Sequence, residues 1–498
     1  MTDKQIDAAF ASSRNLFITG PAGTGKSYRL NEYISKTDNV LVCAPTGIAA
    51  LNVGGETAHK VFHIPVPAYE SPSFAKGKKG ALTKSMISAL IQSDVIVIDE
   101  ISMFKNSDFS FAIKVLRKAE KLKGSKIRVI VSGDFSQLPP VVRKADEKLM
   151  KKFGFDLSGF AFTTSEWKSL NFKVVELTDV KRQSDLEFIT ELNRVRVGDF
   201  TNYDYFNQFV NEDPDYSDGI CICGTNAEAD KINNTYLDEL TGTERAFRST
   251  KTGRVPIGYV DDIIVLKQGA RVIFTANDNI KNQYKNGTFG IVKGFTDDAV
   301  IVTVKDADGN EKDVFVNRQK VSIYSYTATG GTLNKKEVGS VTQFPLRIGK
   351  AITIHKSQGQ TFEKAIISPT IFAAGQLYVA LSRVKSPDGL TLLREISPED
   401  FIIDDVVKQF YTNGYKFDIP KKVAVKKTTT KSASTKAKPK TASTKKATTK
   451  KATGTKKSAT KSVVKKTTRK STKKSATRKS TKKTATRKSS VKKTSAKK

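Results

Sequence analysis

The stretch Gly20-Pro21-Ala22-Gly23-Thr24-Gly25-Lys26-Ser27 decides the fold class of this chain. The apolar run at 16–19 predicts a short buried strand before it, and residues 28–34 predict a helix after it. In such a strand–loop–helix unit, glycines let backbone amides turn inward around phosphate oxygens, and the helix N-terminus adds the positive end of its dipole. Lys26 can then reach the β- and γ-phosphates, and the Ser27 hydroxyl can ligate Mg²⁺. The sequence therefore predicts that this eight-residue loop binds a nucleoside triphosphate.

Residues 1–175 alternate between short apolar runs and helical patterns. The runs at 40–44, 95–98 and 127–131 are continuous, which is typical of strands buried on both faces of a parallel sheet. We therefore expect an α/β nucleotide-binding domain over 1–175. A segment at 62–82 interrupts it with three prolines and a basic tip. Either a solvated surface loop or a nucleic-acid contact would explain that composition.

The rest of the chain divides by composition into three further regions. Mixed α/β character at 176–265 and again at 346–420 predicts a second α/β domain. Between them, residues 266–345 hold short β-type runs separated by Asn-Gly and Asp-Gly turn signals, which predicts a small barrel-like β insertion. Residues 421–498 are low-complexity Lys, Thr, Ser and Ala with almost no apolar side chains, so we expect this tail to be disordered.

The positive charge of the chain is concentrated in that tail. The 498 residues carry a formal net charge of +35, and residues 421–498 hold 31 of the 85 basic residues and none of the 50 acidic ones. The preceding 420 residues, with 54 basic and 50 acidic side chains, are nearly neutral. We expect the tail to bind nucleic acid without sequence preference, because each phosphate that it neutralises releases counterions. Its composition resembles the tails of linker histones, which favours a nucleus or a viral replication site.

Cysteine usage and hydropathy indicate the compartment. The three cysteines, Cys43, Cys221 and Cys223, are too few for a disulfide framework and indicate a reducing, intracellular environment. Cys221 and Cys223 lie in an apolar run without a second Cys/His pair at ligand spacing, so buried thiols explain them better than a metal site. The chain has no run of 18 apolar residues and no secretory signal pattern at its start, so we expect no contact with a membrane.

Acidic and amide side chains follow two of the predicted strands. Asp99 and Glu100 end the run at 95–98. Downstream of a phosphate loop, Asp99 is expected to hold Mg²⁺ and Glu100 to orient or deprotonate the attacking water. Gln137 lies in the segment 133–140 after the next strand, where a glutamine can detect the γ-phosphate. These three residues favour hydrolysis of the bound nucleotide.

Six ordered motifs resemble those of superfamily 1 DNA helicases. They are most similar to the petite-integration-frequency (PIF-type) family, which is related to RecD and to the phage Dda helicase. One stretch departs from the family pattern, because Leu122-Lys123-Gly124-Ser125 stands where the family has Pro-Phe-Gly-Gly. The resemblance covers residues 1–417, and its motifs lie at 20–27, 44–50, 99–103, 133–140, 355–361 and 378–383.

The resemblance implies a fold and an activity. It implies two RecA-like α/β domains, a strand-separating wedge at 62–82 and an SH3-like insertion at 266–345. The implied activity is that of an ATP-dependent DNA helicase, which uses ATP and Mg²⁺ to move 5′→3′ along single-stranded DNA and to unwind forked duplex as a monomeric motor. DNA repair, recombination, replication and telomere maintenance are the implied settings. Two alternatives stay open: a RecD-like motor subunit of a larger complex, and a DNA-condensing protein with an accessory ATPase.

The resemblance also implies roles for single residues. Gln5 resembles the glutamine that reads adenine, which implies ATP, and Gly359 is an implied nucleotide contact. The motif at 178–183 implies that Arg182 contacts the γ-phosphate, and Arg383 resembles an arginine finger of the second domain, a group worth about 10³–10⁵ in rate. The residues implied to line the single-strand track, where hydroxyls and imidazoles can bind phosphates, are Thr46, Thr57, His59, His355 and Ser357. Plain structural roles remain the alternative for the two histidines.

Overall fold

The computed structural model describes residues 2–65, 83–84, 86–216, 219–255, 260–278, 282–305, 309–329 and 332–417. The basic tip predicted for the wedge and the predicted disordered tail at 421–498 lie outside these residues. Within the described ranges, no helix combines the length and the apolar character that a membrane crossing needs.

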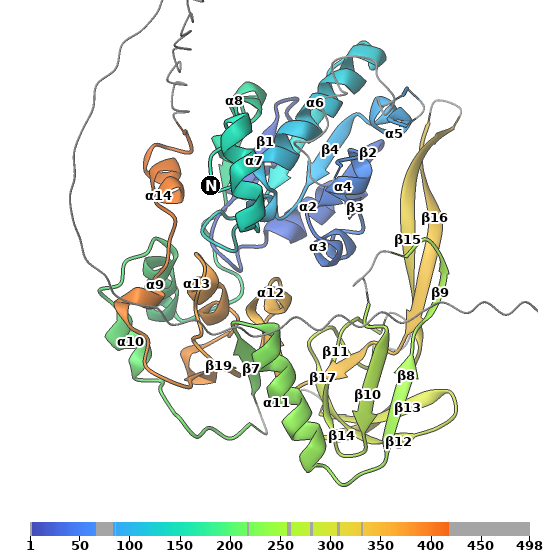
Figure 1. The fold of residues 1–498 in the computed structure, drawn as a ribbon, viewed down its shortest axis with the longest axis vertical. Helices are drawn as coiled ribbons and strands as arrows, with labels where there is room; N and C mark the ends of the chain where they lie inside the picture. Colours follow the sequence, from blue (N-terminus) through green and yellow to red (C-terminus); the bar gives the residue numbers. More distant parts are fainter. Residues whose placement is uncertain are drawn as a thin grey trace, which may run out of the picture. The chain divides into compact units, whose positions relative to one another are not determined.

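Six parallel strands form the first sheet, in the order β3-β2-β4-β5-β1-β6 (Figure 1). Successive side chains of β1 enter two different cores, because Leu16 and Ile18 pack on one face of the sheet and Phe17 packs on the other. Burial on both faces explains why the apolar runs are continuous, and it confirms the predicted parallel α/β sheet. The strands are β1 Leu16–Thr19, β2 Val40–Ala44, β3 Glu56–Thr57, β4 Val95–Ile98, β5 Arg128–Ser132 and β6 Lys173–Glu176.

Helices connect and cover these strands. The longest, α6, presents Phe109, Ile113 and Leu116 to the core that also contains Phe17. The α1 helix begins with a capping box in which Thr2 and Gln5 bond to one another's backbone. The helices of this part are α1 Asp3–Ala11, α2 Lys26–Ser35, α3 Gly47–Asn52, α4 Ala58–Val61, α5 Ser88–Gln92, α6 Asn106–Lys123, α7 Lys144–Phe153 and α8 Ser165–Leu170.

Four parallel strands form the second sheet, in the order β18-β7-β19-β20. Cys221 and Cys223 are buried in β7 as free thiols with their sulfur atoms 3.6 Å apart, as expected for a buried strand. The strands are β7 Ile220–Cys223, β18 Ala351–Thr353, β19 Ala365–Ile367 and β20 Leu390–Leu392. The accompanying helices are α9 Leu186–Arg196, α10 Tyr203–Asn207, α11 Asn226–Glu239, α12 Ile354–Ser357 and α13 Gln376–Leu381.

Antiparallel strands fill the region between β7 and β18 in the sequence. A five-stranded sheet, β14-β13-β12-β11-β17, has its own core of aliphatic and aromatic side chains, and β10-β8 and β15-β16-β9 form two smaller sheets. This region begins at β8, earlier than the predicted start at 266, because β8 and β9 are mostly exposed and charged and lack an apolar run. The strands are β8 Glu244–Arg248, β9 Thr250–Gly253, β10 Ile263–Lys267, β11 Arg271–Phe274, β12 Phe289–Phe295, β13 Ala299–Lys305, β14 Glu311–Asn317, β15 Gln319–Thr329, β16 Thr332–Gln343 and β17 Leu346–Ile348.

The long β15–β16 hairpin reaches from this antiparallel region to the first sheet (Figure 1). The Tyr326 side chain packs against the core of the first sheet, and its hydroxyl accepts a hydrogen bond from the Val42 backbone amide at 3.3 Å. The Lys60 ammonium donates to the Tyr324 carbonyl at 3.1 Å. The hairpin therefore contacts the edge of the first sheet near β2, β3 and α4.

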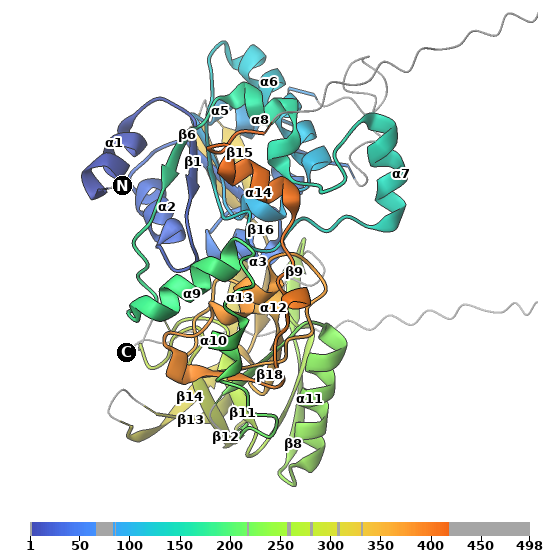
Figure 2. The same cartoon turned by 90° about the vertical axis from the view of Figure 1, so that its left-hand side faces the viewer.

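The last described helix, α14 (Asp405–Thr412), packs with the first sheet (Figure 2). Val407 and Phe410 belong to the core around Phe17, and the Phe410 ring stacks on Phe162 with centroids 4.1 Å apart. The sequence predicts that residues 346–420 belong to the second α/β domain, but the helix at their end packs against the core of the first sheet. The sequence of an amphipathic helix shows which face is buried but not which core that face packs against.

Candidate nucleotide site between the two parallel sheets

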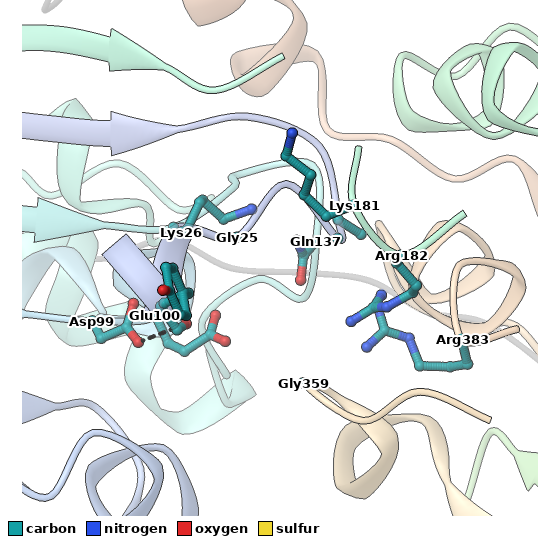
Figure 3. A pocket seen from close by; sticks show the side chains of 14 residues that line it. Gly25, Lys26, Asp99, Glu100, Gln137, Lys181, Arg182, Gly359 and Arg383 are labelled. Carbon is teal, nitrogen blue, oxygen red and sulfur yellow. Dashed lines mark hydrogen bonds between the residues drawn. The ribbon is translucent and has the colours of Figure 1, made fainter. Parts of the chain in front are cut away.

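A cavity of about 340 Å³ lies where the two parallel-sheet halves meet. The first half contributes the phosphate loop, Asp99, Glu100 and Gln137, and the second contributes Gly359 and Arg383, with Arg182 on the segment between them (Figure 3). All six residues predicted to be catalytic therefore line one cavity. The full lining is Ala22, Gly23, Gly25, Lys26, Ser27, Tyr28, Asp99, Glu100, Gly133, Gln137, Lys181, Arg182, Gly359 and Arg383.

The phosphate loop has the backbone geometry that anion binding requires. Gly20 has a φ of +134°, and a Cβ atom there would lie 2.1 Å from the Leu177 carbonyl oxygen, so no other residue fits without a backbone shift. The α2 helix begins at Lys26 without a side-chain cap, which leaves its first amides directed at the cavity. The Lys26 ammonium donates to the carbonyls of Gly20 and Pro21 at 2.8 and 2.9 Å. Pro21 and Thr24 are also predicted nucleotide contacts. The Thr24 hydroxyl donates a hydrogen bond to the Pro21 carbonyl at 2.9 Å, which stabilises the loop.

Two hard oxygen donors meet at the C-terminal end of β4. The Ser27 hydroxyl donates to an Asp99 carboxylate oxygen at 3.3 Å, and Asp99 is only 4% exposed (Figure 3). Burial raises the pKa of Asp99, and a cation bound beside its carboxylate would favour the ionised form. A hydroxyl beside a carboxylate at the start of α2 suits Mg²⁺, which prefers few protein oxygens and retains water. The residues present therefore fit the metal predicted for this site.

Glu100 lies next to Asp99 in an unusual backbone conformation. Its φ of +52° is left-handed, which costs a non-glycine residue about 1–3 kcal/mol and is typical of functional sites. Burial and then the neighbouring Asp99 carboxylate raise the pKa of Glu100 to about 7. Its carboxylate accepts a hydrogen bond from the Gln358 side-chain amide at 3.0 Å. Glu100 thus has the basicity and the position of a group that orients or deprotonates water.

The Gln137 loop is held by a buried ionic cluster. Gln137 lies 3.5 Å from Asp134, whose carboxylate is fully buried and paired with both Nε and Nη2 of Arg196 at 3.0 and 3.1 Å. The Tyr411 hydroxyl donates to the same carboxylate at 2.9 Å and accepts from the Phe135 amide at 2.9 Å. Burial alone would raise the pKa of Asp134, but the Arg196 and Lys26 charges outweigh it and lower that pKa. Helices α9 and α14 therefore meet on the loop that carries Gln137.

Two guanidinium groups form the opposite wall of the cavity. Arg383 is 1% exposed and donates to the carbonyls of Val379 at 2.7 Å and Gln360 at 3.2 Å. Arg182 donates to the Ser382 carbonyl at 2.9 Å. Burial and then the adjacent Arg182 charge lower the pKa of Arg383 well below its ordinary value. Within the described part of the chain neither guanidinium pairs with a carboxylate. A polyanion in the cavity would offset the cost of burying these two charges and their mutual repulsion.

A tyrosine of the second half also contacts the phosphate loop. The Tyr378 hydroxyl, on α13, accepts a hydrogen bond from the Ala22 backbone amide at 2.7 Å, and both residues are buried. Gln358 and Tyr378 lie inside the motifs at 355–361 and 378–383, but the sequence assigns neither residue a role in the site. Arg196 and Tyr411 carry no local signal at all, because their partner Asp134 is 62 and 277 residues away in the chain.

The structure does not bring the other predicted residues to the cavity. Gln5 is exposed, and its side-chain oxygen accepts from the Thr2 amide at 3.0 Å, so it caps α1. Among the predicted track residues, Thr46 caps α3, accepting from the Ala49 amide, and Ser357 is fully buried, with its hydroxyl donating to the Ile354 carbonyl. Thr57 precedes α4, His59 lies 3.4 Å from the Asp108 carboxylate, and His355 is exposed on α12.

The fold and the site together define a P-loop nucleoside triphosphatase whose site is shared by two α/β halves. The sequence model of the PIF1-like helicase family matches residues 2–205. Over 414 residues the chain is 31% identical to the ATP-dependent DNA helicase Pif1 of Bdellovibrio bacteriovorus, an alignment that covers 80% of this chain and 88% of the relative. The human ATP-dependent DNA helicase PIF1 is 31% identical over 425 residues, which cover 81% of this chain and 62% of the human protein. The chain belongs to the PIF1-like helicase family.

Solved structures of Pif1 helicases have the same fold. The crystal structure of Bacteroides sp. Pif1 in complex with ADP-AlF4 is 33% identical, has a TM-score of 0.72 and covers 83% of this chain and 96% of that one. Bacteroides Pif1 bound to single-stranded DNA is 32% identical and has a TM-score of 0.57 over 83% of this chain and 98% of that one. The present structure is therefore more similar to the ADP-AlF4 complex than to the DNA complex.

Proposed function

We propose that this protein is an ATP-dependent DNA helicase that moves 5′→3′ along single-stranded DNA and unwinds forked duplexes. The observation that carries the proposal is the cavity whose walls come from two separate parallel sheets, with Lys26 and Asp99 on one side and Arg383 on the other. A site divided in this way links nucleotide turnover to movement of its two halves. Bacteroides Pif1 has been crystallised with ADP-AlF4 and with single-stranded DNA, and a further Pif1 structure describes DNA unwinding at forked duplex DNA, which supports ATP and those DNA forms as substrates of this chain.

Each residue of the cavity has a proposed task. Lys26 and the α2 amides bind the β- and γ-phosphates, and Ser27 with Asp99 holds Mg²⁺, which neutralises charge on those phosphates. Glu100 orients the attacking water and accepts its proton, while Gln137 contacts the γ-phosphate. Arg182 and Arg383 stabilise the charge that develops as the bond to ADP breaks. Gln5 remains the proposed reader of adenine, which requires its side chain to leave the α1 cap.

The finer architecture is proposed with the same function. The two parallel-sheet halves act as RecA-like motor domains, the antiparallel region acts as an SH3-like insertion, and residues 62–82 act as the wedge. Thr46, Thr57, His59 and His355 are the proposed contacts to the DNA backbone, since each lies near a helix start or is not fully buried. Ser357 would contribute through its backbone, because its hydroxyl is already bonded inside α12. The tail at 421–498, which lies outside the described residues, is proposed to bind nucleic acid through charge alone.

A directional unwinding assay tests this proposal. Forked DNA with only a 5′ or only a 3′ single-stranded tail is mixed with the purified full chain and ATP, and strand release is followed by fluorescence. We expect release from the 5′-tailed substrate, ATP hydrolysis stimulated by single-stranded DNA, and loss of both in Lys26→Ala. Release only from the 3′ tail would reverse the direction. ATP hydrolysis that single-stranded DNA does not stimulate would contradict the helicase function. Unwinding only in the presence of added partner proteins would favour a subunit of a larger complex.

A further inference from the structure

One contact across the cavity is not explained by any of these roles. The Gln358 side-chain amide donates to the Glu100 Oε2 atom at 3.0 Å, although the two residues are 258 positions apart and come from different parallel-sheet halves. Among the described residues, Gln358 is the side chain that forms a hydrogen bond with the Glu100 carboxylate. The proposed water-activating group is therefore held by an amide from the other motor half.

The position of Gln358 connects this bond to the proposed DNA track. Gln358 directly follows α12, the four-residue helix that carries the exposed His355. The carbonyls of Ser357 and Gln360 on either side of it accept hydrogen bonds from Arg383 at 3.4 and 3.2 Å. A shift of α12 would consequently move Gln358 relative to Glu100, because the residues between His355 and Gln358 form a single short turn.

The bond opposes the task proposed for Glu100. A carboxylate that orients water must direct an oxygen at the nucleophile, and the Gln358 amide bonded to Oε2 fixes the whole carboxylate in the direction that it has here. Figure 3 shows the Glu100 carboxylate directed towards the side of the cavity where Gly359 and the two arginines lie, away from Asp99. The bond to the amide therefore fixes the orientation of the Glu100 carboxylate.

We propose that Gln358 is a positioning residue that holds Glu100 away from the attacking water, and that DNA bound along α12 releases it. Gln358 thereby makes ATP hydrolysis depend on DNA. The inference rests on the proposed function, since it requires Glu100 to activate water and α12 to meet DNA. In this arrangement the second half carries both Arg383, which promotes hydrolysis, and the Gln358 amide, which restrains it.

Substitution by methionine tests the switch with little change in shape. Gln358→Met keeps the length of the side chain and removes its donor, and Gln360→Met is the matched control. Gln360 has the same chemistry two residues away and donates to the Lys356 carbonyl instead of Glu100. ATP turnover by the full chain is measured at saturating ATP with no DNA and with saturating oligo(dT), together with KM for ATP and the thermal midpoint.

We expect Gln358→Met to raise turnover without DNA by about tenfold, the scale of one hydrogen bond to a charged group. Turnover with DNA should stay close to that of the parent chain, so the stimulation ratio falls, whereas Gln360→Met keeps the parent ratio. A merely structural role would change the thermal midpoint or KM and leave the ratio alone.

Two results would overturn the inference. Equal loss of turnover with and without DNA would mean that Gln358 supports Glu100 actively, and an unchanged ratio would mean that the contact has no role in coupling. Glu100→Gln separates these failures from failure of the proposed function. If Glu100→Gln abolishes turnover while Gln358→Met leaves the ratio unchanged, only the switch is wrong. If Glu100→Gln retains turnover, the role proposed for Glu100 is wrong, and the role proposed for Gln358 is then wrong as well.

Discussion

Removal of the Arg196 guanidinium should destabilise the protein far more than removal of a neighbouring arginine on the same helix. Arg196 pairs through two nitrogens with Asp134, whose side chain has no exposed surface, and its guanidinium lies 5.1 Å from the Tyr411 ring centre. Arg196→Met leaves that carboxylate buried without its bonded cation, and the Tyr411 hydroxyl at 2.9 Å and the Ser136 backbone amide at 3.1 Å remain as its close donors. Breaking a buried ion pair by deleting one partner costs about 3–5 kcal/mol in free energy of unfolding.

The matched control is Arg194→Met. Arg194 lies two residues earlier on α9 and also forms two ion pairs, with Glu191 at 3.1 Å and Asp199 at 3.0 Å, but its side chain is 36% exposed, against 11% for Arg196. We expect its loss to change stability only slightly, because water screens surface pairs. Urea unfolding of both full-length variants, followed by tryptophan fluorescence and by circular dichroism, gives the free energies. Trp167 packs in the core that also contains Phe135 and Phe410, so its emission reports on this cluster.

A double variant decides whether the cost arises from the pair itself. Asp134→Asn together with Arg196→Met removes both charges, and replacing both members of a buried pair is often neutral or stabilising. The double variant should therefore be more stable than Arg196→Met alone. Equal, small losses for Arg194→Met and Arg196→Met would refute the reasoning, since they would mean that water reaches Asp134. A double variant less stable than either single one would show that the hydrogen bonds, rather than the charges, hold the loop.

Three further outcomes are expected. Arg383→Ala should lower kcat by about 10³–10⁵ while ADP affinity, measured with a fluorescent analogue, changes little, and a loss below tenfold would remove the finger role. Tyr378→Phe leaves the buried Ala22 amide without its acceptor and should lower the free energy of unfolding by about 1–3 kcal/mol; an unchanged urea midpoint would contradict this. Deletion of 421–498 should weaken DNA binding and flatten its salt dependence with kcat at saturating DNA intact, whereas collapse of kcat would show that the tail takes part in turnover.

The first half of the molecule could be predicted from sequence because its information is local. A phosphate loop needs glycines, a lysine and a hydroxyl in one short stretch, and the strand before it must be buried on both faces. Asp99 and Glu100 were predictable for the same reason, since parallel strands end at one edge of the sheet. The motifs around Gly359 and Arg383 came from family resemblance alone, and the cavity brings them to the loop.

The contacts between the halves had no local signal. Arg196 reads as one basic residue among several near the end of a helix, and only the fold reveals that it faces a buried carboxylate. The α14 helix has a strong apolar face, but its sequence does not say that it returns to the first sheet. The start of the antiparallel region was placed too late because exposed edge strands lack the alternation that marks half-buried ones.

Local and long-range bonds together hold the polar groups of the cavity in this structure. In this structure Lys26 is bonded to loop carbonyls, Arg383 to carbonyls of its own half, and Glu100 to Gln358. Because a buried polar group without a partner is costly, each of these bonds stabilises the arrangement of the cavity seen in this structure. Phosphate oxygens can replace the partners of Lys26 and Arg383, since both need only an acceptor. They cannot take the place of Gln358, because Glu100 is the acceptor in that bond and needs a donor, so the proposed switch assigns the release of Glu100 to DNA rather than to the nucleotide.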